Sequence, residues 1–212
     1  MNFISISEAI KKGKGKVAVR GWIHRKRGSN KFIFIVLRDS SDIIQCILKS
    51  EKFEKQWNDI DSLLVESSVE IEGTIKEDKR APTGYEIDAS KINIVGIAGD
   101  FPINKDVNEE LLGDRRHLWL RSRKMTASMK IRSTILFALH EYMHKSGFIE
   151  IHAPSMSGAA SEGGSEVFEV GYFGKKAYMT QSWQFYAENF ISAVEKAYAI
   201  APSFRAEKSK TP

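Results

Sequence analysis

Short stretches in which apolar and polar residues alternate dominate the first half of the chain. In the earliest of them, Val17, Val19 and Ile23 alternate with polar residues. Similar runs follow at 32–37, 43–48, 69–75 and 85–95. A period of two is typical of strands with one buried face, so the pattern predicts five β-strands.

A helical pattern interrupts these strands after the third. Residues 51–64 carry large apolar side chains at the spacing of one helical face, namely Phe53, Trp57, Ile60 and Leu64. Five strands with a helix after the third are the element order of a small barrel of the OB type. We therefore expect a five-stranded OB-fold β-barrel over residues 1–98.

The pattern changes beyond this region. Residues 96–113 contain Gly99 and Pro102 but no sustained periodicity, so we place a hinge over 99–116 and a second domain over 117–212. A helix is predicted where apolar residues recur at helical spacing before Gly147, a helix stop signal. Those residues are Ile131, Ile135, Leu139, Tyr142 and Met143.

The rest of the second domain reads as a mixture of strands and one more helix. That helix is expected from an N-cap at Ser182 to Val194. Pro154 ends the first predicted strand, because proline cannot donate a ladder hydrogen bond, and a loop rich in Gly, Ala and Ser follows it. The predicted strands are 148–153, 167–173, 177–180 and 198–207, with the loop at 155–165 and a turn at Gly174. The chain as a whole is expected to be an α+β protein.

Composition limits the possible classes of protein. The 212 residues are 42% hydrophobic, enough for two compact cores, yet no apolar run approaches the ~20 residues that a membrane span needs. The N-terminus lacks the pattern of a secretory signal, so a cytoplasmic protein is expected. Cys46 is the single cysteine, which excludes an internal disulfide and a cysteine-rich zinc site.

Basic residues are concentrated near the N-terminus. The net charge is +5, but residues 11–31 contain no acidic residue and many lysines and arginines, and a second basic cluster runs over 115–132. Such a stretch attracts a polyanion, although a solvated face is an equally ordinary explanation for a charge run.

One short motif suggests a metal. His140, Glu141 and His144 match the H-E-x-x-H pattern of zinc peptidases on a predicted helix. The same helix is expected to bury Ile135 and Leu139, and no glycine and third histidine of the extended pattern follow. We therefore favour an ordinary structural helix.

Two further groups of residues could bind nucleotides. On the last predicted strand, Arg205 and Glu207 would share a face, either to clamp a phosphate and an amino group or simply as an ion pair. On the second strand, Phe32 and Phe34 would lie either in the core or on a stacking platform for bases. Gln45 lies at an outward-reading position, and Arg25 and Arg27 add charge beside it.

Several segments together resemble one family. YAIAPSFRAEKSKT at the C-terminus is similar to motif 2 of class II aminoacyl-tRNA synthetases, and the helix and strand ending at Pro154 are similar to motif 1. GWIHRKR, FIFIVLRDSSDIIQCIL and RRHLWLRS resemble the anticodon domain of the aspartyl and asparaginyl subgroup and its entry into the catalytic domain. SEGGSEVFEV and YFGKKAY resemble the archaeal and eukaryotic-like asparaginyl type. The resemblance implies an OB domain followed by the first half of a class II catalytic domain with an antiparallel sheet.

This resemblance implies a role for individual residues. Arg205 would contact the α-phosphate of ATP and the amino-acid carboxylate, as the catalytic cation, and Glu207 the adenine amino group. Glu162 would pair with the α-ammonium of the substrate and Gln184 would help to hold it. Phe34 would stack on the middle anticodon base of tRNA(Asn), and Arg25, Arg27 and Gln45 would contact that base or its neighbours. Pro154 would belong to a homodimer interface, and Mg²⁺ would accompany ATP.

The expected substrate is L-asparagine because of Ala187. Aspartyl enzymes have a lysine here whose ammonium meets the substrate carboxylate, and its absence would cost an aspartate on the order of several kcal/mol. An aspartyl enzyme of relaxed specificity and a non-catalytic tRNA-binding module remain alternatives. The sequence ends at Pro212, before the arginine of motif 3, so we expect little or no aminoacylation by this chain alone.

Overall fold

The computed structural model describes residues 2–103, 107–159 and 167–207. Contacts within the chain divide it into two compact units, residues 1–116 and 117–212. Among the described residues, no helix is both long enough and apolar enough to cross a membrane.

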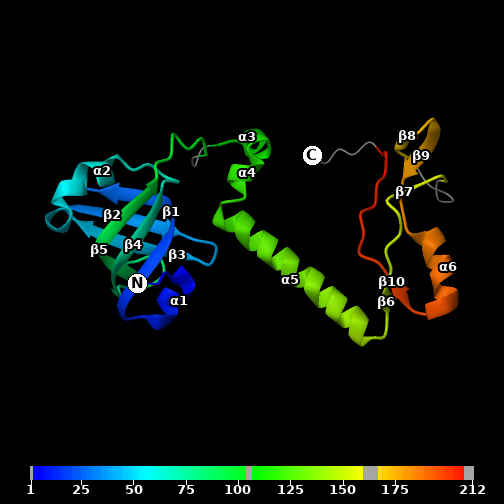
Figure 1. Ribbon diagram of the computed structural model, residues 1–212, viewed down its shortest axis with the longest axis horizontal. Coiled ribbons are helices and arrows are strands. Elements are labelled where there is room, and N and C mark those ends of the chain that lie inside the picture. Colours follow the sequence, from blue (N-terminus) through cyan, green and yellow to red (C-terminus); the bar gives the residue numbers. More distant parts are fainter. Residues whose placement is uncertain (1, 104–106, 160–166, 208–212) are drawn as a thin grey trace. The chain divides into compact units, whose positions relative to one another are not determined.

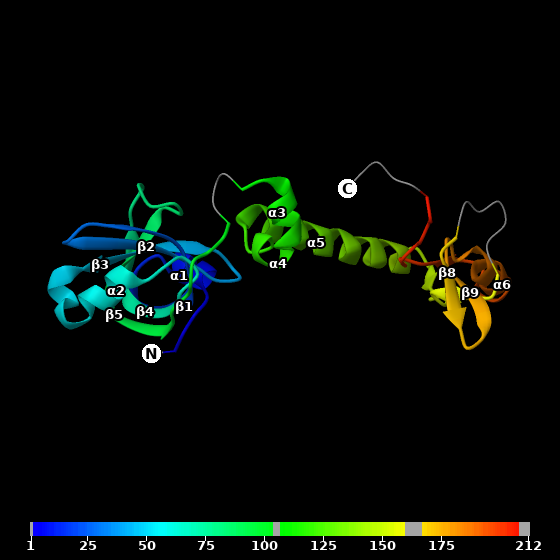
Figure 2. The ribbon, with the colours of Figure 1, turned by 90° about the horizontal axis from the view of Figure 1, so that it is seen from above.

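The first unit is built on a closed barrel, as the alternating pattern predicted (Figures 1 and 2). Its strands are β1 (Gly15–Gly28), β2 (Phe32–Arg38), β3 (Ile43–Lys49), β4 (Ser68–Glu77) and β5 (Tyr85–Gly96). Their order around the barrel is β1-β2-β3-β5-β4. Neighbours are antiparallel except β3 and β5, which close the barrel as a parallel pair. This is the five-stranded OB-fold expected for the N-terminal region.

The period of two in the sequence determines which side chains fill the barrel. On β2, Ile33, Ile35 and Leu37 are fully buried, whereas Phe32 and Phe34 point outward. The core thus consists almost entirely of aliphatic side chains, and the outer face of the same strand is free to carry aromatic ones.

A short helix before the barrel adds to this core. Helix α1 (Ile6–Lys12) buries Ile6 and Ala9 against the barrel. It begins with a capping box, in which the Ser5 side chain accepts a hydrogen bond from the Glu8 backbone and the Glu8 side chain accepts one from the Ser5 backbone.

The predicted helix over 51–64 was wrong in extent. The segment folds as two short 3₁₀ turns, η1 (Ser50–Lys52) and η2 (Glu54–Gln56), and then a brief helix α2 (Trp57–Ser62). Phe53 is buried in the core with a non-helical backbone, so it breaks the helical run. The chain is extended at Leu63, so the helical spacing no longer applies and Leu63 is buried in place of Leu64.

The predicted hinge contains regular structure. Helix α3 (Glu109–Asp114) starts where the Asn108 side chain accepts a hydrogen bond from the Leu111 backbone, and the short helix α4 (Arg116–Trp119) follows. The sequence pattern did not predict these helices, because each is less than two turns long and buries none of its residues.

Beyond α4, the described part of the second unit contains two longer helices and two small sheets. Its elements are α5 (Arg123–Lys145), β6 (Ile149–Glu150), β7 (Met156–Ser157), β8 (Glu169–Tyr172), β9 (Lys175–Met179), α6 (Gln184–Val194) and β10 (Ala197–Tyr198). Strands β7, β9 and β8 form an antiparallel sheet, and β6 pairs with β10 in parallel. Gly147 follows α5 with a left-handed backbone, as predicted, and Gly174 lies in the β8–β9 turn.

Several details of the second unit differ from the prediction. The strand expected over 198–207 is limited to Ala197–Tyr198, and the one over 148–153 to Ile149–Glu150, because they pair only with each other. The predicted loop after Pro154 contains β7. Ser182 precedes α6 without being its cap residue, which is Trp183. Helix α5 buries none of its residues, so Ile135 and Leu139 are exposed where burial was expected.

The barrel core gives a direct test of the fold. Replacing Ile35, which is fully buried, by alanine should lower the free energy of unfolding by about 2–5 kcal/mol, because the cavity is surrounded by packed side chains. The same Ile→Ala change at Ile97, which is 70% exposed, should alter it by less than about 0.5 kcal/mol. Urea unfolding followed by circular dichroism measures both, and equal effects would contradict the inward assignment of Ile35.

Candidate functional site

The outer face of β1 and β2 carries an arginine stacked on a phenylalanine. Arg27 lies opposite Phe34 in the antiparallel register, and its guanidinium carbon is 5.2 Å from the centre of the Phe34 ring. Phe32 is 42% exposed and Phe34 is half-buried, so neither belongs to the core. Of the two alternatives for these side chains, the structure therefore supports an aromatic surface with a cation beside it.

Gln45 on β3 lies next to this stack and is almost completely covered. Its Nε2 donates a hydrogen bond to Glu86 Oε2 over 3.1 Å, and its Oε1 accepts one from Arg27 Nη2 over 3.4 Å. Glu86 is buried on β5, beside β3 in the parallel pair, and also forms an ion pair with Lys76 over 3.0 Å. The outward position predicted for Gln45 holds, but its amide is fixed by partners on both sides.

The loop between β4 and β5 supplies a second charged pair. Arg80 donates two hydrogen bonds to the Asp78 carboxylate, over 3.1 and 2.8 Å. These bonds, with one from the Arg80 backbone, lower the pKa of Asp78 to about 2. The Arg80 side chain itself is 90% exposed, so its outer surface is open to a ligand.

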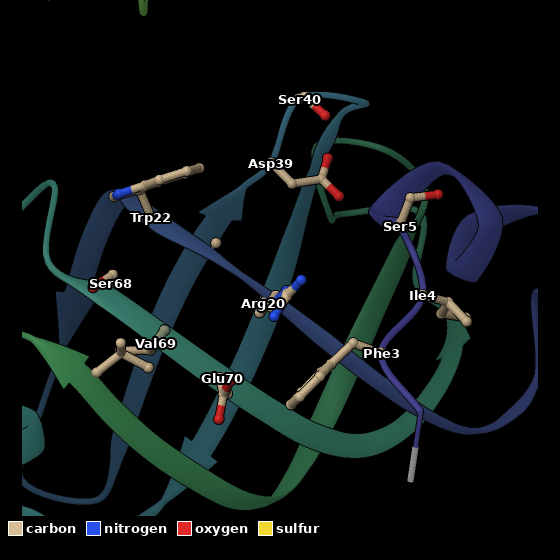
Figure 3. A pocket seen from close by; sticks show the side chains of 12 residues that line it. Phe3, Ile4, Ser5, Arg20, Trp22, Asp39, Ser40, Ser68, Val69 and Glu70 are labelled. Atoms are coloured by element: carbon tan, nitrogen blue, oxygen red, sulfur yellow. The ribbon is translucent and has the colours of Figure 1, made fainter.

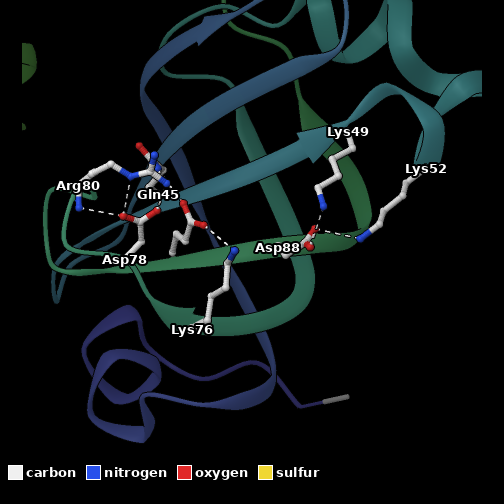
Figure 4. A network of polar contacts seen from close by, with 8 residues as sticks. Gln45, Lys49, Lys52, Lys76, Asp78, Arg80 and Asp88 are labelled. Atoms are coloured by element: carbon white, nitrogen blue, oxygen red, sulfur yellow. Dashed lines mark hydrogen bonds and ion pairs between the residues drawn. The ribbon is translucent and has the colours of Figure 1, made fainter.

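These residues line one hollow of about 290 Å³ on the barrel. Figure 4 shows the polar contacts of Gln45, Asp78 and Arg80, three of the lining residues. Its wall combines aromatic and charged side chains, and its lining residues are Arg27, Phe32, Phe34, Gln45, Ile47, Lys49, Asp78, Arg80 and Glu86. The structure thus brings together the predicted Arg27, Phe34 and Gln45. Arg25 is exposed on β1, opposite Val36 in the register, and is not among the lining residues.

Sequence reasoning missed Asp78, Arg80 and Glu86 as members of this site. The charges of the Asp78–Arg80 loop lie far along the chain from the phenylalanines, and Glu86 reaches Gln45 only because β3 and β5 pair in parallel. The one available signal was the alternation of Glu86 and Asp88 with Ile87 on β5, which places both carboxylates on the outer face.

A second hollow of about 590 Å³ lies elsewhere on the barrel (Figure 3). There Arg20 stacks on Phe3 at 5.5 Å, and the exposed Trp22 lies on the far side of Arg20. The Asp39 carboxylate accepts hydrogen bonds from the backbones of Ile6 and Ser41, so its charge is used within the unit. This hollow repeats the arginine-on-phenylalanine contact without a buried amide and carboxylate behind it.

In the second unit, Arg205 and Glu207 point to the same side of the chain. Arg205 Nη1 is 3.9 Å from Glu207 Oε1, and both side chains are more than half exposed. Their segment runs beside the end of β9, because Phe204 donates a backbone hydrogen bond to Thr180 and the Ser203 hydroxyl donates one to the Gln181 carbonyl. This brings the segment next to the start of α6.

Other predicted substrate residues lie on or near α6. The Gln184 side chain donates a hydrogen bond to Glu188 over 2.9 Å, and Ala187 is half-buried on the same helix. Glu162 lies outside the described residues. Pro154 is exposed in the segment between β6 and β7.

The H-E-x-x-H motif serves the fold of the second unit. His140 Nδ1 is 2.9 Å from the Tyr198 hydroxyl and 3.4 Å from Glu150 Oε2, while Glu141 pairs with Lys145. Within the described part of the chain, no three His, Cys, Asp or Glu side chains converge as metal ligands.

Family models match both units. Residues 17–95 match the OB-fold nucleic acid binding domain, and residues 108–212 match tRNA synthetases class II (D, K and N). An OB barrel followed by this second region defines part of a class II aminoacyl-tRNA synthetase.

Individual relatives narrow the family further. The asparagine–tRNA ligase of Thermoplasma acidophilum is 48% identical over 98% of this chain and 49% of its own length, and that of Streptococcus sanguinis is 40% identical over 92% and 46%. The crystal structure of asparaginyl-tRNA synthetase from Pyrococcus horikoshii complexed with asparaginyl-adenylate has a TM-score of 0.91 at 36% identity, covering 100% of this chain and 50% of that one. The chain belongs to the asparaginyl-tRNA synthetases and spans about half the length of the curated relatives it matches.

The Asp78–Arg80 pair predicts a titration in the candidate site. The pKa of Asp78 is lowered from 3.8 to about 2, so the pair is complete above pH 4 and its stabilising effect is lost as the pH falls through about 2. Arg80→Gln should return the pKa of Asp78 toward 3.8. Lys79→Gln removes the same charge at the adjacent residue and should leave the pKa of Asp78 near 2. Carboxyl NMR titration measures both variants, and an unmoved pKa in Arg80→Gln would contradict this cause.

Proposed function

We propose that the hollow around Phe34 binds the anticodon of tRNA(Asn). The observation that carries the proposal is the combination of Phe34, Arg27, Gln45 and Glu86 in one hollow of an OB barrel. Aromatic faces stack on bases, and an arginine beside them attracts the negatively charged phosphates of RNA.

The fixed amide of Gln45 gives this site its selectivity. Because Glu86 accepts from Nε2, the amide cannot flip without leaving a buried carboxylate short of a donor. Oε1 therefore faces Arg27 and the hollow and would accept a hydrogen bond from a base edge. Arg25 and Arg80 would contact neighbouring phosphates or bases from the exposed sides.

We further propose that the whole protein activates L-asparagine as an adenylate and transfers it to tRNA. Arg205 would hold the α-phosphate of ATP and the substrate carboxylate, and Glu207 the adenine amino group. Arg205 Nη1 lies 3.9 Å from Glu207 Oε1, so the two side chains are close enough to contact one nucleotide, which supports a shared site. Glu162 and Gln184 would hold the amino acid, and the charge of Arg205 would stabilise the developing negative charge at phosphorus.

Magnesium enters this proposal only with ATP. The resemblance implies that the ion accompanies the phosphates of the nucleotide, and none of the roles above depends on it. The protein is proposed to act in the cytoplasm.

A homodimer is proposed through the motif 1 region. The side chains Ile131, Ile135, Leu139 and Tyr142 form an exposed stripe along α5. A helix in water would bury such a stripe, and Pro154 lies in the segment that the resemblance assigns to the same interface.

The anticodon proposal is tested by removing the stacking ring. Phe34→Ala should weaken binding of an RNA stem-loop with the anticodon GUU by about 1–3 kcal/mol, which is roughly 5- to 150-fold in Kd. Fluorescence anisotropy with the labelled stem-loop measures the change.

The second hollow supplies the matched control. Phe3 carries an arginine at 5.5 Å, as Phe34 does at 5.2 Å, so Phe3→Ala removes an equivalent stack elsewhere on the barrel. It should leave RNA binding unchanged. Equal losses in the two variants would refute the assignment of the anticodon to the hollow around Phe34.

The preference for asparagine is tested at Ala187. Ala187→Lys in the full-length protein should reduce asparagine-dependent ATP–pyrophosphate exchange and favour aspartate, because a new ammonium would pair with a substrate carboxylate. Ala193→Lys makes the same change at an exposed position of α6 and should alter neither rate. Unchanged discrimination in Ala187→Lys would exclude this residue as the determinant.

A further inference from the structure

Lysines gather at the end of α1 without acidic partners. Lys11, Lys14 and Lys16 are exposed, and within the described residues none of them forms an ion pair. We refer to these three residues as the lysine edge. Lys12, between them, donates a hydrogen bond to the Lys16 carbonyl over 2.8 Å and thereby holds the turn.

Several other lysines of the same unit form ion pairs with carboxylates. Lys49 and Lys52 both pair with Asp88, and Lys91 pairs with Glu72. The acidic residue of α1 is Glu8, whose carboxylate accepts hydrogen bonds from the backbone and hydroxyl of Ser5. Lys11 helps to lower the pKa of Glu8, after these hydrogen bonds, but does not form an ion-pair contact with it. The lysine edge thus keeps its positive charge for a ligand outside the unit.

The backbone connects this edge to the hollow around Phe34. Lys16 pairs with Thr74 on β4, and Lys76 follows two residues later and reaches Glu86 in the hollow (Figure 4). A Cβ on Gly13 would be 3.4 Å from the Tyr85 ring, which places the end of α1 beside the start of β5.

The turn itself is open to a ligand. Gly13 and Gly15 have positive φ values of 67° and 91°, so the chain turns sharply and Lys14 projects between them. Nothing lies within 4 Å of the Cβ position of Gly15. A phosphate could therefore approach the backbone here as well as the lysine side chains.

We propose that the lysine edge binds backbone phosphates of the same RNA whose bases enter the hollow around Phe34. The ligand class is a polyanionic RNA strand continuing from the anticodon past Lys76. This inference rests on the proposed anticodon site and adds a separate, sequence-independent contact to it.

The test separates phosphate contacts from base stacking by their dependence on salt. Lys14→Gln/Lys16→Gln should lower the slope of log K against log salt by about 1.4–1.8, because each lost phosphate contact contributes roughly 0.7–0.9. Binding of the GUU stem-loop to the 212-residue chain is measured between about 50 and 200 mM salt. Phe34→Ala should lower affinity at every salt concentration and keep the slope.

The control removes the same charge from other positions. Lys55→Gln/Lys91→Gln lowers the net charge by the same amount at exposed positions outside the edge and should leave the slope within experimental error of the unmodified chain. If both double variants show the same slope while the unmodified chain still binds, the lysine edge makes no phosphate contact and the anticodon site stands. If the unmodified chain does not bind the stem-loop, the proposed anticodon function fails, and this inference with it.

Discussion

The parallel pairing of β3 with β5 is the contact on which the candidate RNA site depends. It closes the barrel, and it is also what places Gln45 beside Glu86 although 41 residues separate them in the chain. Without closure, Glu86 would be a solvated carboxylate and the Gln45 amide would be free to rotate. The aliphatic core drives this closure, since Cys46 and Ile87, directly paired in the same register, are both fully buried.

Much of the first unit could be predicted because a period of two carries strong information. The alternation of Ile33, Ile35 and Leu37 with the residues between them determined which face of β2 points into the barrel, and with it the outward position of Phe34. The ends of α2 could not be predicted, because the burial of Phe53 by the barrel overrode local helical spacing. The charged side of the site was also missed, since nothing local in the sequence indicates that β3 and β5 are neighbours.

In the second unit, local sequence patterns predicted neither the burial of side chains nor the length of the last strand. Apolar spacing predicted the course of α5, but burial depends on a partner, and the described residues of the unit cover none of its apolar stripe. The strand expected around Arg205 is not formed. Among the described residues beyond Tyr198, one backbone hydrogen bond, from Phe204 to Thr180, joins the segment to a neighbouring one. Even so, Arg205 and Glu207 lie on one side, as alternation implied. The predicted alternation of side chains is therefore present at these two residues, although the predicted β-strand pairing is not.

The arrangement of Gln45 between Arg27 and Glu86 has a consequence for the unliganded state. Both ends of its amide are already bonded, and Oε1 keeps one lone pair that can accept a further hydrogen bond. At the proposed anticodon site, a base that presents a donor to Oε1 would gain that bond, whereas a base that presents an acceptor would meet a like partial charge. Discrimination would then come from the orientation in which the barrel holds the amide before any ligand arrives.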